Sequence, residues 1–269
     1  MEEMDAEGAP EYGEDLPARD EKAREVSPLL VSLSGRHGER HLCRHFNAVR
    51  LSKSQRPDLA AARGKPLIIY LNHPTWWDPL ICLQLAGQFF ADRRHFGPID
   101  AGMSRHRVFE RLGFFGVDPG TARDVRRFLT ISQEILARPD AALWIPAAGR
   151  LTDPRERPVR LRSGIGYLAS RVRQAVLLPL ALEAPFWDAE LPEVLARFGE
   201  EIPAGDVGLG ASDWTTVLED RLESALEALA AESLARDAAR FDVLLAGGGA
   251  ASGFSGAWRR LRARWVGRS

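Results

Sequence analysis

The sequence predicts a single α/β domain in which helices flank a mixed, mostly parallel sheet. Short apolar runs typical of buried strands alternate with longer segments in which apolar residues recur at helical spacing. The 269 residues are 45% hydrophobic and 27% charged, a composition ordinary for one globular domain with a sizeable core. Acidic residues gather at the N-terminus and arginines at the C-terminus. We therefore expect a disordered acidic tail before the domain and a basic amphipathic tail after it.

The predicted strands and helices follow one another along the chain. The first strand spans about 66–71, and a helix from Pro79 to about Phe89 follows, because proline suits the first position of a helix. Pro179 in a later strand predicts an edge or a bulge, since proline has no amide hydrogen to donate. Ser212 is expected to cap the last helix. The other predicted elements are a strand at 95–100, a helix at 104–112 ending at Gly113, a short apolar run at 114–117, a helix at 121–137, a strand at 141–145, a loop at 147–163, a helix at 164–173, a strand at 176–182 and a helix at 212–236.

Charge and composition place the domain boundaries. Residues 1–26 are predicted to be disordered, because the first 22 residues hold nine acids against one arginine and one lysine. The globular domain is expected over 27–242. Residues 243–269 then form a glycine-rich linker and a basic helix, in which five arginines surround Trp258, Leu261 and Trp265. Such a helix suits an anionic membrane surface, or else docks on the protein's own core. The basic and apolar stretch 40–57 is a candidate second membrane contact.

Other features exclude several classes of protein. The formal net charge of −1 gives no overall attraction to nucleic acid. Cys43 and Cys82 have neither zinc nor redox spacing, which predicts structural thiols, a reducing compartment and no metal site. The chain has no apolar run of about 18 residues and begins with acids, so neither a spanning helix nor a signal peptide is expected. The glycines at 247–249 lack the residues of a phosphate-binding loop, and no Gly-x-Ser-x-Gly elbow is present.

The candidate catalytic residues are His73 and Asp78, which have four residues between them at the end of an apolar strand. Histidine suits proton transfer near neutral pH, and an aspartate beside it fixes the tautomer and stabilises the imidazolium. A loop that follows a buried strand is a common place for such residues. A structural alternative also exists, because Asp78 before Pro79 is a typical helix cap.

The order of motifs along the chain resembles the PlsC-like glycerolipid acyltransferases, the lysophosphatidate acyltransferase family. The resemblance covers about residues 45–205. It is carried by four blocks: Asn72-His73-Pro74-Thr75-Trp76-Trp77-Asp78, then Gly113-Phe114-Phe115-Gly116-Val117, then Leu143-Trp144-Ile145-Pro146-Ala147-Ala148-Gly149-Arg150, and finally Arg162-Ser163-Gly164 with Leu177-Leu178-Pro179-Leu180-Ala181. The His-x4-Asp block is the most specific of them.

The resemblance implies an O-acyltransferase of membrane lipids. In that family the histidine removes a proton from an acceptor hydroxyl, which attacks an acyl thioester, from acyl-CoA or acyl carrier protein, without an acyl-enzyme. No cofactor is implied beyond this co-substrate. Gly149, Arg150 and Arg123 become candidate substrate-binding residues, with backbone amides near Gly149 as candidates for stabilising the oxyanion. The resemblance also implies a cytoplasmic protein bound peripherally to the inner membrane.

The chain departs from the family at two positions. The third block usually contains a glutamate that holds the acceptor, whereas Ala147 and Ala148 occupy the possible positions here. The arginine often found after the second block is absent, and Arg123 lies a few residues further on. The acceptor is therefore a lysophospholipid, or a glycolipid, isoprenoid glycoside or aminolipid, and a non-catalytic lipid-binding protein is a further alternative. Of Trp76 and Trp77, one is expected to line an acyl channel and the other to pack in the core.

Overall fold

The computed structural model describes residues 26–247, except 58–59, 61, 103–106, 118–120 and 205–207. The predictions for the acidic tail and for the basic tail with Trp258, Leu261 and Trp265 lie outside these residues. The described residues form one nine-stranded sheet in the order β4-β3-β5-β2-β6-β7-β1-β9, with β8 paired to β6. Five of its pairings are parallel and three antiparallel, as predicted for a mixed, mostly parallel sheet.

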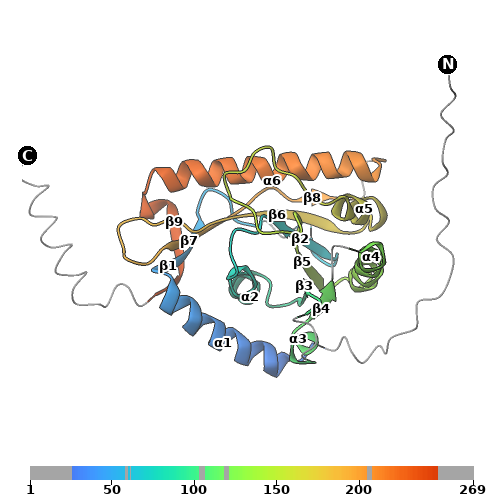
Figure 1. The fold of residues 1–269 in the computed structure, drawn as a ribbon, viewed down its shortest axis with the longest axis horizontal. Coiled ribbons are helices and arrows are strands. Elements are labelled where there is room, and N and C mark those ends of the chain that lie inside the picture. Colours follow the sequence, from blue (N-terminus) through green and yellow to red (C-terminus); the bar gives the residue numbers. More distant parts are fainter. Residues whose placement is uncertain are drawn as a thin grey trace, which may run out of the picture.

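The strands and helices alternate along most of the chain (Figure 1). The strands are β1 (Ala48–Ser52), β2 (Leu67–Leu71), β3 (Arg94–Asp100), β4 (Phe114–Val117), β5 (Ala141–Pro146), β6 (Val176–Glu183), β7 (Glu193–Phe198), β8 (Ile202–Pro203) and β9 (Phe241–Ala246). The α-helices are α1 (Pro28–His45), α2 (Asp78–Phe89), α3 (Arg107–Arg111), α4 (Ala122–Leu136), α5 (Ser163–Arg171) and α6 (Ala211–Leu234), and a 3₁₀ turn, η3, spans Ala238–Arg240. The predicted elements between 66 and 182 agree with these bounds to within a few residues.

Helices cover both faces of the sheet, which gives the domain two hydrophobic cores. On one face, α4, α5 and α6 bury side chains such as Ile68 and Leu143, and α6 runs along the sheet in Figure 1. On the other face, α1 and α2 bury the alternate residues, such as Ile69 and Trp144. Side chains of a strand point to opposite faces in turn, so both cores draw on the same strands. This explains why β2 and β6 read as continuous apolar runs.

Two elements near the N-terminus were not predicted. The stretch 40–57, expected as a membrane contact, contains the end of α1 and the whole of β1. Phe46, Val49 and Leu51 are buried in the core, so the apolar residues of this stretch pack inside the protein, and a membrane contact through its basic residues stays a prediction. Arg50 interrupts the run of apolar residues in β1, which hides the strand in the sequence. In the structure its Nε lies 2.9 Å from Glu193 Oε2 on β7. A charged residue in a strand is tolerated when it has a buried partner of this kind.

Three further predictions need correction. The boundary at 242 falls inside β9, which continues to Ala246 and pairs with β1. Pro179 lies in an interior strand, not at an edge. On one side of β6, β8 pairs with residues 176–177 and β7 with residues 180–183, so Pro179 falls between the two partners. Its missing amide hydrogen therefore costs no hydrogen bond of the sheet, and its carbonyl accepts from the Gly199 amide. Gly210, without a side-chain hydrogen bond, stands at the N-cap of α6 in place of Ser212.

Candidate active site

His73 and Asp78 lie at the carboxyl end of β2, where the chain turns into α2. The β2 strand is fully buried between β5 and β6, so the loop 72–77 emerges from the centre of the sheet. Ligands of open α/β sheets usually bind in the crevice outside the carboxyl ends of the strands. The loop therefore places both side chains where a substrate can reach them while rigid strands hold their backbone.

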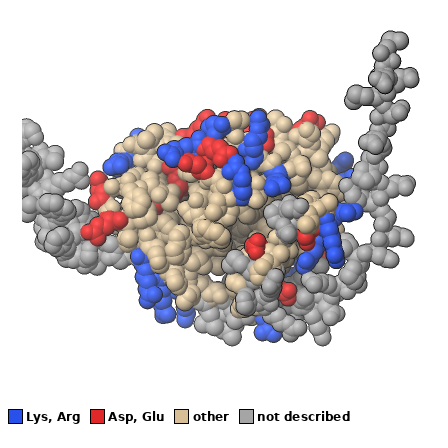
Figure 2. Space-filling view, viewed as in Figure 1, with Lys and Arg blue, Asp and Glu red and all other residues tan. Residues whose placement is uncertain are grey.

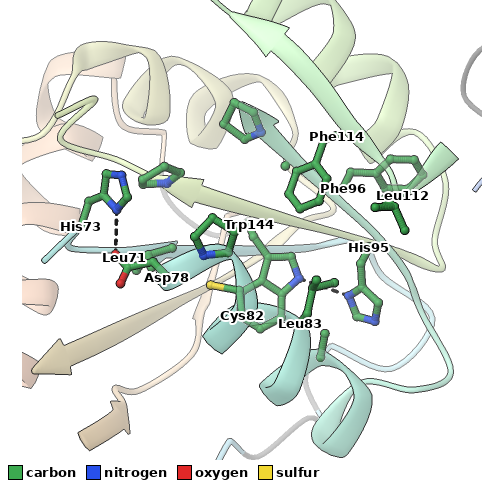
Figure 3. Close-up of a pocket in the computed structure, with 15 residues that line it drawn as sticks. Leu71, His73, Asp78, Cys82, Leu83, His95, Phe96, Leu112, Phe114 and Trp144 are labelled. Atoms are coloured by element: carbon green, nitrogen blue, oxygen red, sulfur yellow. Dashed lines mark hydrogen bonds and ion pairs between the residues drawn. The ribbon is translucent and has the colours of Figure 1, made fainter. Parts of the chain in front are cut away.

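The two side chains form a hydrogen bond. His73 Nδ1 lies 2.7 Å from Asp78 Oδ2, with side-chain exposures of 22% and 4% (Figure 3). Because a carboxylate only accepts hydrogen bonds, Nδ1 carries the hydrogen and Nε2 keeps its lone pair. The pair therefore has the arrangement required of a general base and its orienting acid.

A network of short bonds fixes the loop. Thr75 Oγ1 donates to Asp78 Oδ1 at 2.7 Å, so both carboxylate oxygens are engaged. The His73 backbone is held in both directions by Thr152, whose amide donates to the His73 carbonyl at 2.8 Å and whose hydroxyl accepts from the His73 amide at 3.3 Å. Asn72 continues the β2–β6 ladder with its side chain, which bonds the Leu182 carbonyl and amide at 2.9 Å each.

Asp78 is the first residue of α2 rather than its cap. Trp77 stands at the N-cap position and makes no side-chain cap bond. The Asp78 carboxylate turns back toward His73 and Thr75 instead. The geometry therefore favours a hydrogen-bonding role toward His73 for Asp78 over a role as helix cap.

A pocket of about 560 Å³, measured out to its open mouth, begins at His73 and Asp78. Its wall is mostly apolar and comes from α2, β3, β5 and the turn between α3 and β4. The lining residues are Leu71, His73, Asp78, Pro79, Cys82, Leu83, Ala86, His95, Phe96, Gly97, Pro98, Leu112, Phe114, Trp144 and Pro146. In Figure 3 the His73–Asp78 pair lies at one end and His95 at the other, with Trp144 between them. An elongated apolar group with a reacting end fits this shape.

The turn at Gly113 brings two of these residues into the wall. Gly113 has φ +91°, and a side chain there would collide with the His95 carbonyl. Only glycine combines that backbone conformation with such a close approach. Leu112 and Phe114, on either side of it, consequently reach the pocket.

His95 is a pocket residue that the sequence did not single out. Its Nδ1 accepts from Trp144 Nε1 at 3.1 Å, and its Nε2 donates to the Phe90 carbonyl at 3.0 Å. Burial lowers its pKa to about 4, although the Phe90 carbonyl acts in the opposite direction. His95 is therefore neutral near pH 7 and both nitrogens are occupied. Its place in the pocket depends on β3 and β5 being neighbours, which no local motif reports.

Cys82 is the other titratable group in the wall. Burial, together with the nearby Asp78 carboxylate, raises the pKa of the Cys82 thiol well above its usual value. A thiol in that state is a poor nucleophile. Within the described residues, no group of three or more histidine, cysteine or acidic side chains is arranged to hold a metal ion.

The loop 147–162 borders the site but contributes little to the pocket. Gly149 and Arg150 do not line it. Gly149 has φ +66°, and its amide donates to the Pro146 carbonyl at 3.0 Å, so this amide is already used in a turn. Arg150 is exposed and forms an ion pair with Glu156. The structure therefore places both residues beside the site, not in contact with the pocket.

Arg162 and Arg123 differ in their relation to this loop. Arg162 lies against Gly149, where a Cβ would be 3.1 Å from Arg162 Nε, and its amide donates to the Ala147 carbonyl at 2.9 Å. It thus borders Ala147 and Ala148, the two positions at which the sequence resemblance implies a glutamate. Arg123 is exposed in the first turn of α4 and does not line the pocket.

The two tryptophans of the motif both lie outside the pocket. Trp77 packs on α1, with its ring centroid 4.4 Å from that of His45. Trp76 is 78% exposed. Trp77 therefore has the packing role, while the structure gives Trp76 a surface position and no place in the pocket wall.

A smaller, more polar hollow of about 320 Å³ adjoins the same loop from the α6 side. Polar residues line one part of it, and Leu222 and Leu226 of α6 line another. The polar residues are Asn72, Thr152, Asp153, Glu156 and Arg160. Asn72 and Thr152 connect this hollow to His73.

No protein-family profile matches the sequence, and no match is found among curated proteins. Among solved structures, the chain is similar to the crystal structure of the 1-acyl-sn-glycerophosphate (LPA) acyltransferase, PlsC, from Thermotoga maritima. The TM-score is 0.51 with 16% sequence identity, over 80% of this chain and 85% of that chain. At this identity the similarity shows a shared fold. None of the helices in the described ranges is long and apolar enough to cross a bilayer.

Proposed function

We propose that the protein is an acyltransferase that moves a fatty acyl group from an acyl thioester to the hydroxyl of a lipid. The observation that carries this proposal is the 2.7 Å bond from His73 Nδ1 to Asp78, in a side chain that lines an apolar pocket and whose Nε2 has no hydrogen-bond partner among the described residues. The similarity to the fold of an LPA acyltransferase agrees with it. The order of the sequence motifs agrees as well.

The reaction needs one base and no covalent enzyme intermediate. His73 Nε2 takes the proton of the acceptor hydroxyl while that oxygen attacks the thioester carbonyl carbon. The carbon–sulfur bond then breaks, and the imidazolium returns the proton to the leaving thiolate. Asp78 stabilises the imidazolium between these steps. General-base help of this kind contributes about 10²–10⁴-fold, and positioning supplies much of the rest.

The two hollows suggest where the substrates bind. The apolar pocket suits the acyl chain of the donor, because its wall comes mainly from apolar residues of α2, β3 and β5. The polar hollow suits the head of the acceptor, because Asn72 and Thr152 join it to the His73 loop. A lysophospholipid is the acceptor we favour. Because no carboxylate replaces the family glutamate, a glycolipid, an isoprenoid glycoside or an aminolipid is the second candidate.

The lipid substrates place the enzyme at the inner surface of a membrane, to which we propose it binds peripherally. The basic segment 256–269, with Trp258 and Trp265, is one proposed contact. Deleting that segment is expected to weaken sedimentation with anionic vesicles. Unchanged sedimentation would refute a role for it.

The decisive experiment measures thiol release from long-chain acyl-CoA and acyl carrier protein with a panel of lysolipids. We expect turnover with wild type and a loss of about 10²–10⁴-fold in His73→Ala. His37→Ala, the same substitution on an exposed histidine outside the pocket, is the matched control and should retain turnover in detergent. Turnover that survives His73→Ala would overturn the mechanism.

The same experiment tests a non-catalytic lipid-binding protein. Tight binding of long-chain acyl-CoA without turnover on any acceptor would favour it. Both carboxylate oxygens of Asp78 are engaged and His73 Nε2 is free, an arrangement that lipid binding alone does not require. We therefore place the catalytic function first.

A further inference from the structure

Helix α1 carries a basic surface that the proposed reaction does not use. Two columns of side chains, each at every fourth residue, lie next to each other on the helix. We call these residues the α1 basic face: Arg36, Arg40, Arg44, His37, His41 and His45. Five of the six are exposed and His41 is partly buried. The opposite side of the helix, with Gly38 and Leu42, is buried toward α2.

The histidines form a continuous column that ends at the catalytic loop. The ring centroids of His37 and His41 are 4.6 Å apart, and those of His41 and His45 are 5.9 Å apart. The His45 ring then packs on Trp77 at 4.4 Å. Trp77 lies between His73 and Asp78 in the chain and follows the exposed Trp76. The column therefore runs along the basic face to the loop that carries His73.

The positive charge of this face is not neutralised within the described residues. None of its arginines forms an ion pair there, and Glu39 is the single acid among the described side chains of α1. The elements packed on α1 are α2, β1 and β9. Their charged groups are engaged elsewhere: Asp78 with His73, Arg50 with Glu193, and Asp242 with Arg56 and Lys53. Cys82 on α2 stays neutral because burial raises its pKa.

We propose that the α1 basic face docks on an anionic lipid surface, and that its histidine column makes this docking stronger as the pH falls. The inference rests on the proposed function, since it names the surface from which the lipid acceptor is taken. The arginines supply charge at any physiological pH, and a histidine adds charge to such a surface when it is protonated as the pH falls. Three neighbouring imidazoliums repel one another in water, and an anionic surface offsets that repulsion.

Two observations favour a membrane over an acidic protein as the partner. Figure 2 shows basic side chains over α1 on the same face of the molecule that is hollowed at its centre. Two apolar side chains are also exposed on the loops of the site: Trp76, in the loop that carries His73, at 78%, and Leu151, which precedes the Thr152 that bonds His73, at 40%. An exposed tryptophan beside a basic helix suits the headgroup boundary of a bilayer. A membrane at this face would meet the mouth of the pocket.

The test is sedimentation of the full chain with phosphatidylglycerol-containing vesicles at about pH 7.5 and about pH 5.5, where the lipid charge stays constant while histidine titrates. We expect wild type to bind about tenfold or more tightly at the lower pH. In H37N/H41N/H45N that increase should disappear while binding at the higher pH persists. In R36Q/R40Q/R44Q binding should fall about 100-fold at both pH values, since each basic residue near such a surface contributes about fivefold.

The matched control removes three arginines from the amino ends of the parallel strands, at the opposite end from the site. Arg94, Arg138 and Arg173 precede or begin β3, β5 and β6, far from the carboxyl ends that carry the site. R94Q/R138Q/R173Q should bind vesicles as wild type does. An equal loss in this control, a pH increase that persists without the three histidines, or equal binding to neutral phosphatidylcholine vesicles would each overturn the proposal.

Activity in detergent separates this proposal from the proposed function. The α1 variants should retain thiol release with a soluble, monomeric lysolipid, which also shows that they fold. His73→Ala should lose activity and keep vesicle binding. If the α1 variants bind vesicles normally but lose the use of an acyl carrier protein donor, the face docks that acidic protein and the lipid proposal is wrong.

Discussion

His73 and His95 line the same pocket, yet their ring nitrogens have opposite surroundings. His73 donates from Nδ1 to a buried carboxylate, and its other nitrogen has no hydrogen-bond partner among the described residues. His95 accepts from the Trp144 indole and donates to the Phe90 carbonyl, so neither nitrogen is free. Burial lowers the pKa of His95 to about 4. A histidine in a pocket is therefore a candidate base only when its partners leave one nitrogen free and stabilise the charged ring.

The difference also shows how one pocket can be apolar and still hold the proposed proton-transfer group. Asp78 is placed on the His73 side, at the end of β2, where the mouth meets solvent. At the other end, the Trp144–His95 pair satisfies its own polar atoms and leaves an uncharged wall. An acyl chain can contact that wall without stranding a charge.

The largest effect is expected from replacing the carboxylate that bonds His73 with a neutral amide. In Asp78→Asn the amide nitrogen can donate to Nδ1, which moves the imidazole hydrogen to Nε2 and removes the base. We expect kcat/KM for acyl transfer to fall about 10²–10⁴-fold, measured by thiol release. Asp213→Asn, at an exposed aspartate in the first turn of α6 that lines neither hollow, is the control. Activity near wild type in Asp78→Asn would show that His73 does not need this carboxylate.

His95 should make the folded state less stable in acid. The unfolded chain protonates this histidine as the pH falls below about 6.5, while the folded chain resists protonation until about pH 4. The unfolded state thus binds the extra proton, and up to about 3 kcal/mol of stability is lost across that window. Urea unfolding at a series of pH values should show this loss in wild type and a flatter profile in His95→Gln. Identical profiles would mean that His95 is protonated normally in the fold.

Trp144→Phe tests the same histidine from its other side. The substitution removes the donor to His95 Nδ1 and leaves a buried acceptor unpaired, which costs about 2 kcal/mol. We expect a lower midpoint of thermal unfolding but a pH–rate profile of wild-type shape, because His73 is not disturbed. A changed profile would indicate that His95 takes part in proton transfer after all.

The sequence predicted the His73–Asp78 pair because both residues belong to one short segment, and the strand before it fixes their geometry. Trp144 and Phe114 were visible only as members of motifs, and His95 not at all, because the pocket forms when β3, β4 and β5 become neighbours. In the fold, β2 and α2 had clear patterns. The edge around β1 and β9 was missed, since Arg50 in β1 obscures the alternation and is accommodated only through Glu193, far away in the sequence.

The smallest effect is expected from Thr75, which holds the second oxygen of Asp78. Its hydroxyl donates to Oδ1 at 2.7 Å and also accepts from the Trp77 amide at 3.1 Å. Thr75→Val keeps the shape and removes both bonds. The carboxylate stays in place through His73 but becomes less well oriented, which costs about 1 kcal/mol of transition-state stabilisation, or about fivefold in kcat. Thr75→Ser, which retains the hydroxyl, should restore most of the rate. A valine variant as fast as wild type would show that the hydrogen bonds of Thr75 do not matter, and that His73 alone sets the orientation of Asp78.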